Sequence, residues 1–272
     1  MTETSAAYPM GGSQIEKQRL LSQAAAFEPQ AKRLLEQIGI QPGWRAVDVG
    51  CGPIGILDLL SERVGPQGLV IGLEREPLFC EMAREEVLLR ALKNVKIIQG
   101  DALSTGLEKQ SFDLVHERLV LLNVQDRAAF LAEMVSLLRP GGTIVLENID
   151  SVSWVCHPTH RSWDALRDAL YTAFHGIGGD AFVGRRQPEL LREAGIQNIQ
   201  MKIEVAAPKP GDHRRTQLIS LIDSIRGKVV SMGLMSETEL NGHREALLNH
   251  LANPSTTVID ELFVQCWGEK PS

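Results

Sequence analysis

The sequence predicts an α/β fold with a mostly parallel sheet, and three observations point to it. Short apolar stretches alternate with helical patterns between residues 46 and 149. A Gly-x-Gly-x-x-Gly turn at residues 50–55 follows the first stretch and opens a helix. The second stretch ends at Glu74, and the third ends just before Asp101. Strands that alternate with helices form a parallel sheet covered on both faces, so a ligand should lie beyond the carboxyl ends of the strands.

The elements of this sheet follow from apolar runs that glycine and proline separate. Gly65-Pro66 and the Pro-Gly-Gly run at 140–142 are typical breaks between a helix and the next strand. Pro53 suits the first position of the helix after the glycine turn. The pattern predicts strands at 46–50, 68–74, 95–99, 112–117 and 143–149, with helices at 53–64, 77–92 and 126–138.

Two helices are expected before the first strand. Ser13 and Glu16 form a Ser-x-x-Glu capping box that begins one helix. Glu28 and Pro29 begin a second helix, which Gly39 closes.

The second half of the chain is less regular. Residues 150–186 form an insertion rich in Trp, His and Phe, with a helix expected at 158–174. The pattern then predicts a helix at 187–194, a strand at 197–205, two helices within 212–250 that separate at Gly233, and a last strand at 257–267. We expect residues 150–180 and 207–255 to pack together over the ligand end of the sheet.

Composition and charge narrow the class of protein. Of the 272 residues, 43% are hydrophobic and 23% are charged, so a packed core is expected. The net charge is −6 and no block of lysine and arginine occurs, which argues against a nucleic-acid partner. The four cysteines form no Cys-x-x-Cys pair. The start of the chain lacks a signal-peptide pattern, and no apolar stretch suits a bilayer. We therefore expect a soluble, cytoplasmic protein with no membrane partner.

Negative charge around the glycine turn limits what could bind there. Asp48 lies inside the first strand, two residues before Gly50. Glu74 ends the next strand, where a carboxylate can accept both ribose hydroxyls of a nucleoside, and Asp101 follows the third. These charges would repel a pyrophosphate and would favour a ligand that carries an ammonium and a sulfonium.

These motifs resemble those of the class I S-adenosylmethionine (SAM) dependent methyltransferases. The matching features are hydrophobic-Asp-x-Gly-x-Gly at 47–52, the acid at the end of the second strand, and Gly-Asp-Ala at 100–102. The resemblance is firm over residues 44–147 and implies SAM as cofactor. It also implies a Rossmann-like, doubly wound, mostly parallel seven-stranded sheet with N-terminal helices and a helical cap. The expected parts of this single structural domain are an N-terminal lid at 1–40, a SAM-binding core at 41–150, an aromatic cap insertion at 151–186, and the remainder of the sheet at 187–272 with a helical insertion at 207–255.

The resemblance assigns residues to the methionine and ribose parts of SAM. Gly50 and Gly52 should line the methionine part, with the backbone of Cys51 beside them. A plain strand-to-helix turn is the alternative. Glu74 should accept hydrogen bonds from the ribose hydroxyls, and a surface acid at a strand end is the alternative.

The adenine is expected beyond the third strand. Asp101 should accept a hydrogen bond from the adenine amino group while the backbone of Ala102 meets the ring. The alternative is that Asp101 caps a short turn before Leu103. Arg75 could stack on the adenine or could be solvated.

Three further residues are candidates for cofactor contact. Asp48 could orient the ammonium group through water, or could satisfy loop amides as a buried acid. Glu117 ends the fourth strand, from which members of the family contact the methionine end, although many of them have a small residue there. A salt bridge with Arg118 is the alternative. Gln23 could reach the carboxylate of SAM, or its helix could pack on the outside of the sheet.

The aromatic insertion favours a hydrophobic pocket for the methyl acceptor, although aromatic side chains usually belong to a core. The candidate substrate-binding residues are Tyr8, Met10, Trp154, His160, Tyr171, Phe174 and Phe182. His157 is the candidate catalytic residue, because it could accept or relay a proton. No acid or cysteine accompanies the histidines of this insertion at metal-ligand spacing, so we expect no metal site.

The expected function is methyl transfer from SAM to a hydrophobic small molecule. Residues 8–13, with Glu16 and residues 19–21, are similar to the leading segment of bacterial natural-product methyltransferases. This similarity implies a secondary metabolite, such as a terpenoid or an indole alkaloid, as acceptor. One interpretation is C-methylation of a prenyl alkene with carbocation-driven cyclisation, and another is O- or N-methylation of a small molecule or a quinone-like compound. An NAD-dependent oxidoreductase and a non-catalytic nucleoside-binding protein are further alternatives. The sequence leaves a homo-oligomer open.

Overall fold

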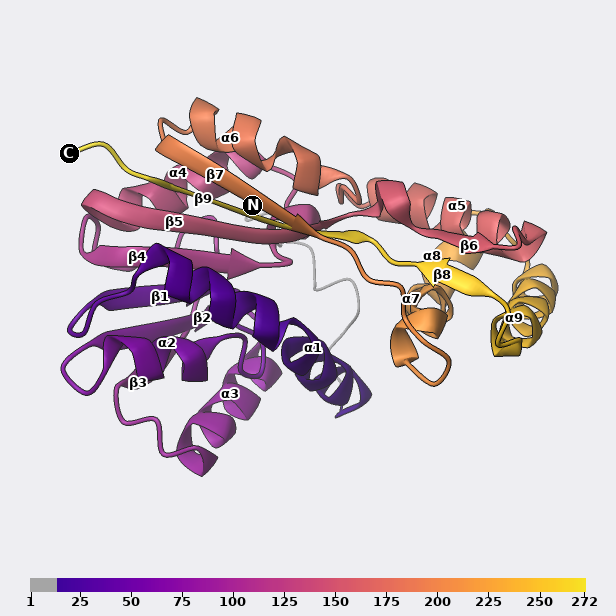
Figure 1. Ribbon diagram of the computed structural model, residues 1–272, viewed down its shortest axis with the longest axis horizontal. Helices are drawn as coiled ribbons and strands as arrows, with labels where there is room; N and C mark the ends of the chain where they lie inside the picture. Colours follow the sequence, from indigo (N-terminus) through magenta and orange to yellow (C-terminus); the bar gives the residue numbers. More distant parts are fainter. Residues whose placement is uncertain (1–13) are drawn as a thin grey trace, which may run out of the picture.

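The computed structural model describes residues 14–272 and has a seven-stranded central sheet with helices on both faces (Figure 1). Its strands are β1 (Arg45–Val49), β2 (Leu69–Glu74), β3 (Val95–Gln99), β4 (Phe112–Arg118), β5 (Leu138–Asp150), β7 (Gln197–Glu204) and β9 (Leu262–Glu269). Their spatial order is β3-β2-β1-β4-β5-β9-β7. Strands β1 to β5 pair in parallel, and β9 is antiparallel to both of its neighbours. The structure confirms the predicted α/β fold with a mostly parallel sheet.

Alternating side chains bind each face of the sheet to its own helices. One face carries α1 (Gln14–Ile38), α2 (Leu57–Val64) and α3 (Pro77–Leu89), and the other carries α4 (Arg127–Leu137) and α6 (Gln187–Glu193). On β1, Val47 and Val49 are buried in the core beneath α4 and α6, whereas Ala46 is buried in the core beneath α1 and α2. This division follows from the two-residue period of a strand.

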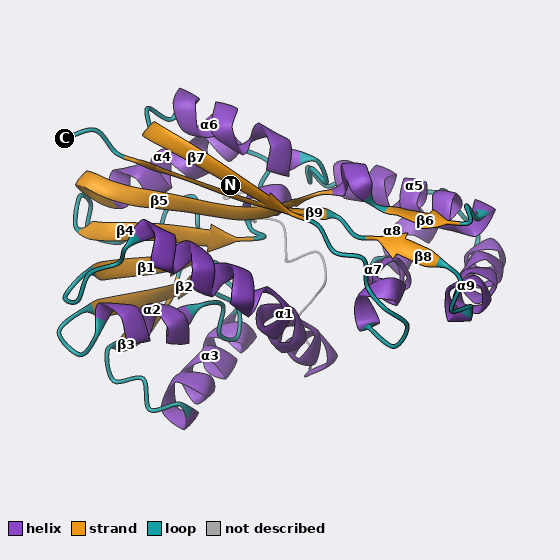
Figure 2. Cartoon of the chain, in the orientation of Figure 1, coloured by secondary structure: helices purple, strands orange, loops and turns teal. Residues whose placement is uncertain are grey.

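A helical cap extends from the end of the sheet at which β4 and β5 finish (Figures 1 and 2). Its elements are β6 (Val155–His157), α5 (Arg161–His175), α7 (Gln217–Ser224), α8 (Arg226–Ser231), α9 (Glu237–Ala252) and β8 (Thr257–Ile259). Short 3-10 turns connect the elements of the chain: η1 (Leu121–Asn123), η2 (Ser151–Ser153), η3 (Val183–Arg186) and η4 (His213–Thr216). Trp163, Leu218 and Leu240 are buried together in the cap. The segments 150–180 and 207–255 therefore pack against each other.

The helix break expected at Pro29 does not occur. Residues 14–38 form the single helix α1, with Pro29 inside it. A proline inside a helix removes a backbone hydrogen bond and normally bends or ends the helix. Packing holds both halves in place here. Before the proline, the ring of Phe27 stacks on Phe263 with centroids 4.2 Å apart. After it, Leu34 and Leu35 are buried against the sheet.

The last predicted strand is two strands in the structure. β8 pairs with β6 in the cap, whereas β9 pairs with β5 and β7 in the central sheet. Asp260 and Glu261 separate the two strands, and the chain passes from the cap to the sheet at these residues. The apolar pattern of residues 257–267 could not show this, because it does not reveal which partner each half pairs with.

Two helical boundaries also differ from the prediction. Helix α2 begins at Leu57 and not at residue 53, because Gly55 has φ +51°, outside the right-handed helical region. Residues 212–250 contain three helices where two were expected. The predicted break near Gly233 separates α8 from α9, and a further break at Ile225 separates α7 from α8. None of the helices in residues 14–272 combines the length and the apolar character needed to cross a bilayer.

Replacing Trp163 by alanine should strongly destabilise the cap. Trp163 is 2% exposed and packs edge-on against Trp154, with ring centroids 5.6 Å apart. Loss of a buried tryptophan leaves a cavity and should lower the free energy of unfolding by about 3–5 kcal/mol. Leu88→Ala is the control, because Leu88 is 80% exposed, and it should change stability by about 0.5 kcal/mol or less. Urea unfolding measures both, and equal stability of the two variants would contradict a packed cap core.

Candidate cofactor site

The glycine turn after β1 is shaped by three residues with positive φ. Gly50, Gly52 and Gly55 have φ of +72°, +56° and +51°, which side chains rarely allow. A Cβ atom at Gly50 would collide with Val120, and one at Gly55 would collide with the carboxylate of Asp48. A Cβ atom at Gly52 would meet nothing within 4 Å. The turn therefore packs tightly at both ends and leaves open space at Gly52, as a ligand-binding loop requires.

Glu74 ties the end of β2 to this turn. The backbone N–H of Gly52 donates to Oε2 of Glu74 at 2.9 Å, and the N–H groups of Arg75 and Glu76 donate to Oε1 at 2.8 and 2.9 Å. The residue is 8% exposed, and burial raises the pKa of its carboxyl group. The structure thus brings Glu74 to the glycine turn, and its role toward the ribose stays a prediction.

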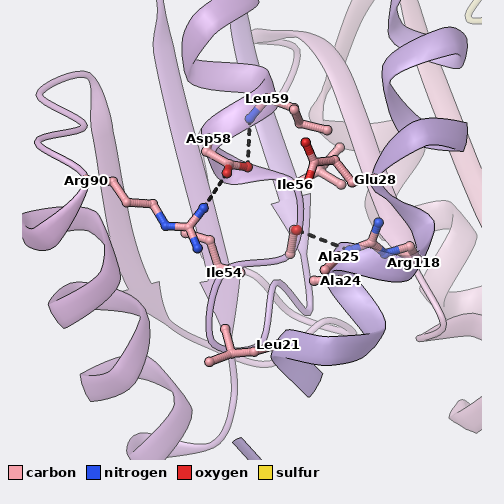
Figure 3. A pocket seen from close by; sticks show the side chains of 11 residues that line it. Leu21, Ala24, Ala25, Glu28, Ile54, Ile56, Asp58, Leu59, Arg90 and Arg118 are labelled. Atoms are coloured by element: carbon pink, nitrogen blue, oxygen red, sulfur yellow. Dashed lines mark hydrogen bonds and ion pairs between the residues drawn. The ribbon is translucent and has the colours of Figure 1, made fainter. Parts of the chain in front are cut away.

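Helix α1 lies over the same turn and encloses a cavity with it. The cavity is lined by Leu20, Gln23 and Ala24 of α1, by Asp48 and residues 50–55, and by Arg118 and Leu119 at the end of β4. A second hollow lies between α1, the turn and α2, and includes Glu28, Asp58 and Arg90 (Figure 3). The structure therefore brings Gln23 together with Gly50, Cys51 and Gly52.

A buried row of charged side chains runs beneath the turn across three strands. Nδ1 of His116 on β4 is 2.7 Å from Oδ1 of Asp48 on β1, and Nε2 of His116 is 3.1 Å from Oε2 of Glu147 on β5. These three residues are 0–1% exposed. Oδ2 of Asp48 also accepts the N–H of Ile56 at 3.3 Å, and Gln265 on β9 donates to Glu147 at 2.5 Å. Asp48 is thus a buried acid that satisfies a loop amide, one of the two expected alternatives.

The charges in this row stabilise one another. Burial alone would lower the pKa of His116, but the charge of Asp48 and hydrogen bonds to Asp48 and Glu147 raise it to about 9. Burial would raise the pKa of Glu147, but the hydrogen bond and charge of His116, followed by the charge of Arg118, lower it. The ring of His116 is therefore an imidazolium at neutral pH and donates to a carboxylate on each side.

Glu117 points away from the cofactor cavity and serves the fold. It is 0% exposed and accepts hydrogen bonds from the N–H groups of Val120 and Leu121 at 2.9 and 3.1 Å and from Asn148 at 2.5 Å. Burial raises its pKa to about 7. The assignment of its side chain to the cofactor is therefore wrong, because the neighbouring Arg118 lines the cavity instead.

The residues expected near the adenine lie at the ends of β2 and β3. Oδ1 of Asp101 accepts the N–H of Leu103 at 2.8 Å, so this carboxylate caps the short turn that the alternative reading describes. Ala102 packs against the core beneath α4. The guanidinium of Arg75 lies 3.8 Å from the carboxylate of Glu76 at the surface. A role of Asp101 and Ala102 toward adenine stays a prediction.

Three residues of the cap that were expected to bind substrate or to act in catalysis lie in other surroundings. Trp154 is 1% exposed and packs in the cap core against Trp163, so it cannot touch a substrate. His160 caps α5, because its Nδ1 accepts the N–H of Ser162 at 3.2 Å, and its ring stacks on His250. His157 is an exposed residue of β6 beside Thr257, in the cap and away from the glycine turn (Figure 1). The structure does not support a catalytic role for His157.

The remaining aromatic candidates lie where the cap meets the sheet. Tyr171 and Phe182 form an edge-on pair with centroids 5.2 Å apart, and the hydroxyl of Tyr171 donates to the carbonyl of Ser151 at 3.5 Å. Phe174 packs beside the core beneath α4. Their substrate role stays a prediction. Tyr8 and Met10 lie outside the described residues. Within residues 14–272, no three His, Cys, Asp or Glu side chains are grouped as a metal site would need.

Sequence reasoning missed the central members of the site. His116 and Glu147 were not singled out for any function, and Arg118 was named only beside Glu117 at the end of the fourth strand. The available signal was a run of charged residues at the ends of otherwise apolar strands, at 116–118 and at 147. Buried charges of this kind need partners, and the partners lie on neighbouring strands that the sequence does not align.

A protein-family model described as a methyltransferase domain matches residues 40–200, more than half of the chain. The chain therefore belongs to the methyltransferase-domain family. Its seven-stranded, mostly parallel sheet with helices on both faces is that of a class I SAM-dependent methyltransferase domain.

Similar curated proteins cover part of the chain. Demethylmenaquinone methyltransferase of Staphylococcus aureus is 37% identical over 114 residues, which are 42% of this chain and 46% of that protein. The chain thus spans less than half the length of the curated relatives that it matches.

Solved structures show the same fold at low sequence identity. A putative methyltransferase from Bacillus halodurans is 15% identical, with 89% of this chain and 99% of that chain covered and a TM-score of 0.59. Phosphoethanolamine N-methyltransferase 2 of Haemonchus contortus, solved with S-adenosyl-L-methionine, is 19% identical, with 90% and 53% covered and a TM-score of 0.54. These two solved structures thus share the fold of this chain.

His116→Gln should remove a pH-dependent part of the stability. The pKa of His116 is about 9 in the folded protein against 6.5 ordinarily, so folding favours the protonated ring. This stabilisation is fully present below pH 6.5 and is lost as the pH rises through about 9. The difference in unfolding free energy between wild type and variant should narrow by about 3 kcal/mol over this interval.

Urea unfolding of both proteins between about pH 6 and about pH 10 measures this difference. His175→Gln, an exposed histidine at the end of α5, is the matched control and should give a constant difference. A constant difference for His116→Gln as well would contradict the buried imidazolium.

Proposed function

We propose that the protein transfers a methyl group from SAM to a carbon atom of a hydrophobic small molecule, with a prenyl alkene as the first candidate. The observation that carries this proposal is that the described residues lining the cofactor cavity include no free base. Among the described residues that line it, the ionisable side chains are Asp48, Cys51 and Arg118.

None of these three side chains is suited to take a proton from an acceptor. Asp48 is already bonded to His116 and to the N–H of Ile56. Burial, with the charge of Asp48 nearby, raises the pKa of the Cys51 thiol well above its usual range. Arg118 is a permanent cation. A hydroxyl or amine that must be deprotonated would find no partner here, whereas an alkene carbon has no proton to lose before attack.

The chemistry of an alkene acceptor balances without a base at the moment of transfer. SAM supplies a methyl group on a sulfonium. The π electrons of the alkene form the new carbon–carbon bond, and the pair of the broken carbon–sulfur bond stays on sulfur. The positive charge then lies on the acceptor, which closes a ring with another of its own double bonds or loses a proton to water.

Aromatic rings near the cavity would stabilise such a charge. The ring of Phe27, which stacks on Phe263, already accompanies a cation, because the guanidinium of Arg118 lies 5.9 Å from it. Aromatic faces attract cations by about 0.5–2 kcal/mol each. Tyr171 and Phe182 add a second aromatic pair at the base of the cap. Helix α1 covers the turn and excludes water, which would otherwise compete for the methyl group.

A quinone-like ring is the second candidate acceptor. The relatives that are 37% identical over 114 residues are named demethylmenaquinone methyltransferases. An electron-rich quinol ring would also be attacked at carbon, which agrees with a cavity without a free base. The resemblance of residues 8–13 to the teleocidin-pathway enzyme, which methylates a prenyl double bond on an indole alkaloid, favours the alkene instead.

The acceptor can be assigned by an assay with matched substrates. Purified protein with methyl-labelled SAM should label a prenylated indole through a new carbon–carbon bond, and should leave the analogue with a saturated prenyl chain unlabelled. Mass spectrometry and NMR of the products locate the label. Label on oxygen or nitrogen, or equal labelling of the saturated analogue, would contradict C-methylation of an alkene. Methylation of a naphthoquinol ring without reaction of the alkene would establish the second candidate in its place.

A further inference from the structure

Arg118 has an unused hydrogen-bonding position inside the cofactor site. Its side chain is only 8% exposed. Nη2 donates to the carbonyl of Gly55 at 3.1 Å, whereas Nη1 is buried without a hydrogen-bond partner. Oε2 of Glu147 lies 4.0 Å from Nη1, which is too long for a hydrogen bond. A buried donor of a charged group is rarely left unpaired unless a ligand completes it.

Arg118 lies between the two hollows beside the glycine turn. Arg118 lines both the cavity over Gly50 and Gly52 and the hollow behind the turn. Figure 3 shows its guanidinium beside Ala24 and Ala25 of α1, with the bond to the Gly55 carbonyl. The guanidinium is thus held between the turn and the helix that covers it.

The buried row of charges explains why the guanidinium of Arg118 is held in place while its Nη1 stays free to donate a hydrogen bond. From one contact to the next the charges alternate: Asp48 is negative, His116 positive, Glu147 negative and Arg118, on the same strand as His116, positive. Glu147 directs its hydrogen bonds to His116 and Gln265. It therefore attracts Arg118 from 4.0 Å without occupying Nη1. An anion on the cavity side would complete the alternation.

We propose that Nη1 of Arg118 binds the α-carboxylate of SAM. The carboxylate is the anionic group of SAM, whose sulfonium and ammonium are both cations. A guanidinium is well suited to a carboxylate, because its N–H groups point along fixed directions and the bonds are charge-assisted. Gln23, on α1 in the same cavity, can donate to the same group. This inference rests on SAM as the cofactor and not on the acceptor proposed above.

The test compares two ligands that differ only in the carboxylate. Calorimetric titration of wild type and Arg118→Met with SAM and with decarboxylated SAM measures four affinities. Arg118→Met should weaken SAM binding by about 10- to 100-fold, as expected for loss of a charged hydrogen bond. It should change the affinity for decarboxylated SAM by about threefold or less. Any general damage to the fold would weaken the binding of both ligands together. The ratio of the two affinities therefore reports on the contact with the carboxylate alone.

Arg90→Met is the matched control. Arg90 lines the neighbouring hollow, but its guanidinium already bonds Asp58 and Glu86, so the variant should leave the ratio of the two affinities unchanged. Equal weakening of both ligands by Arg118→Met, or no weakening of SAM, would overturn the assignment. Neither result depends on an acceptor. A wild type that binds SAM but methylates none of the offered acceptors would count against the proposed function alone.

Discussion

The pairing of His116 with Asp48 and Glu147 is the constraint on which the cofactor end of the sheet depends. The three side chains lie on β4, β1 and β5 and are buried. Taking charges out of water is costly, and it is offset only when each charge has a well-placed partner. Removing one member leaves an uncompensated charge in the core, so the registers of three neighbouring strands are fixed together. Gln265 on β9 donates to Glu147, so the register of β9 is fixed by the same row of charges.

The site follows from this constraint in a few steps. Asp48 holds the N–H of Ile56 and leaves no room for a side chain at Gly55, so the turn has one path. Glu74 then fixes Gly52 from β2. Helix α1 covers the turn because Phe27, Leu34 and Leu35 pack along the sheet on either side of its proline. What remains open is the space beside Gly52, framed by backbone, by the paired carboxylate of Asp48 and by Arg118 with its unpaired Nη1. Such a site can hold and orient a reactive donor without supplying a base.

Much of the fold and part of the candidate site could be predicted from the sequence. The remainder depends on contacts between residues that lie far apart in the chain. The β3 strand was predicted with the bounds Val95–Gln99 that the structure has, because turns limit the apolar run on both sides. The glycines and Glu74 were found because their chemistry is local to the turn. Glu117 and Trp154 were misassigned, because a pattern along one strand or helix does not say which side chains meet across the sheet or inside the cap. His116 was missed for the same reason, since its partners are 68 and 31 residues away. Whether the aromatic pair at Tyr171 meets an acceptor stays a prediction.

The central claim is that this turn, with acids around it, holds a sulfonium donor and not a dinucleotide. Calorimetric titration of the protein with S-adenosylhomocysteine and, separately, with NAD tests this most directly. The account predicts saturable binding of S-adenosylhomocysteine and no detectable heat with NAD, because the carboxylates of Asp48 and Glu74 beside the turn repel a pyrophosphate. Binding of NAD with comparable affinity, or no binding of S-adenosylhomocysteine, would contradict it.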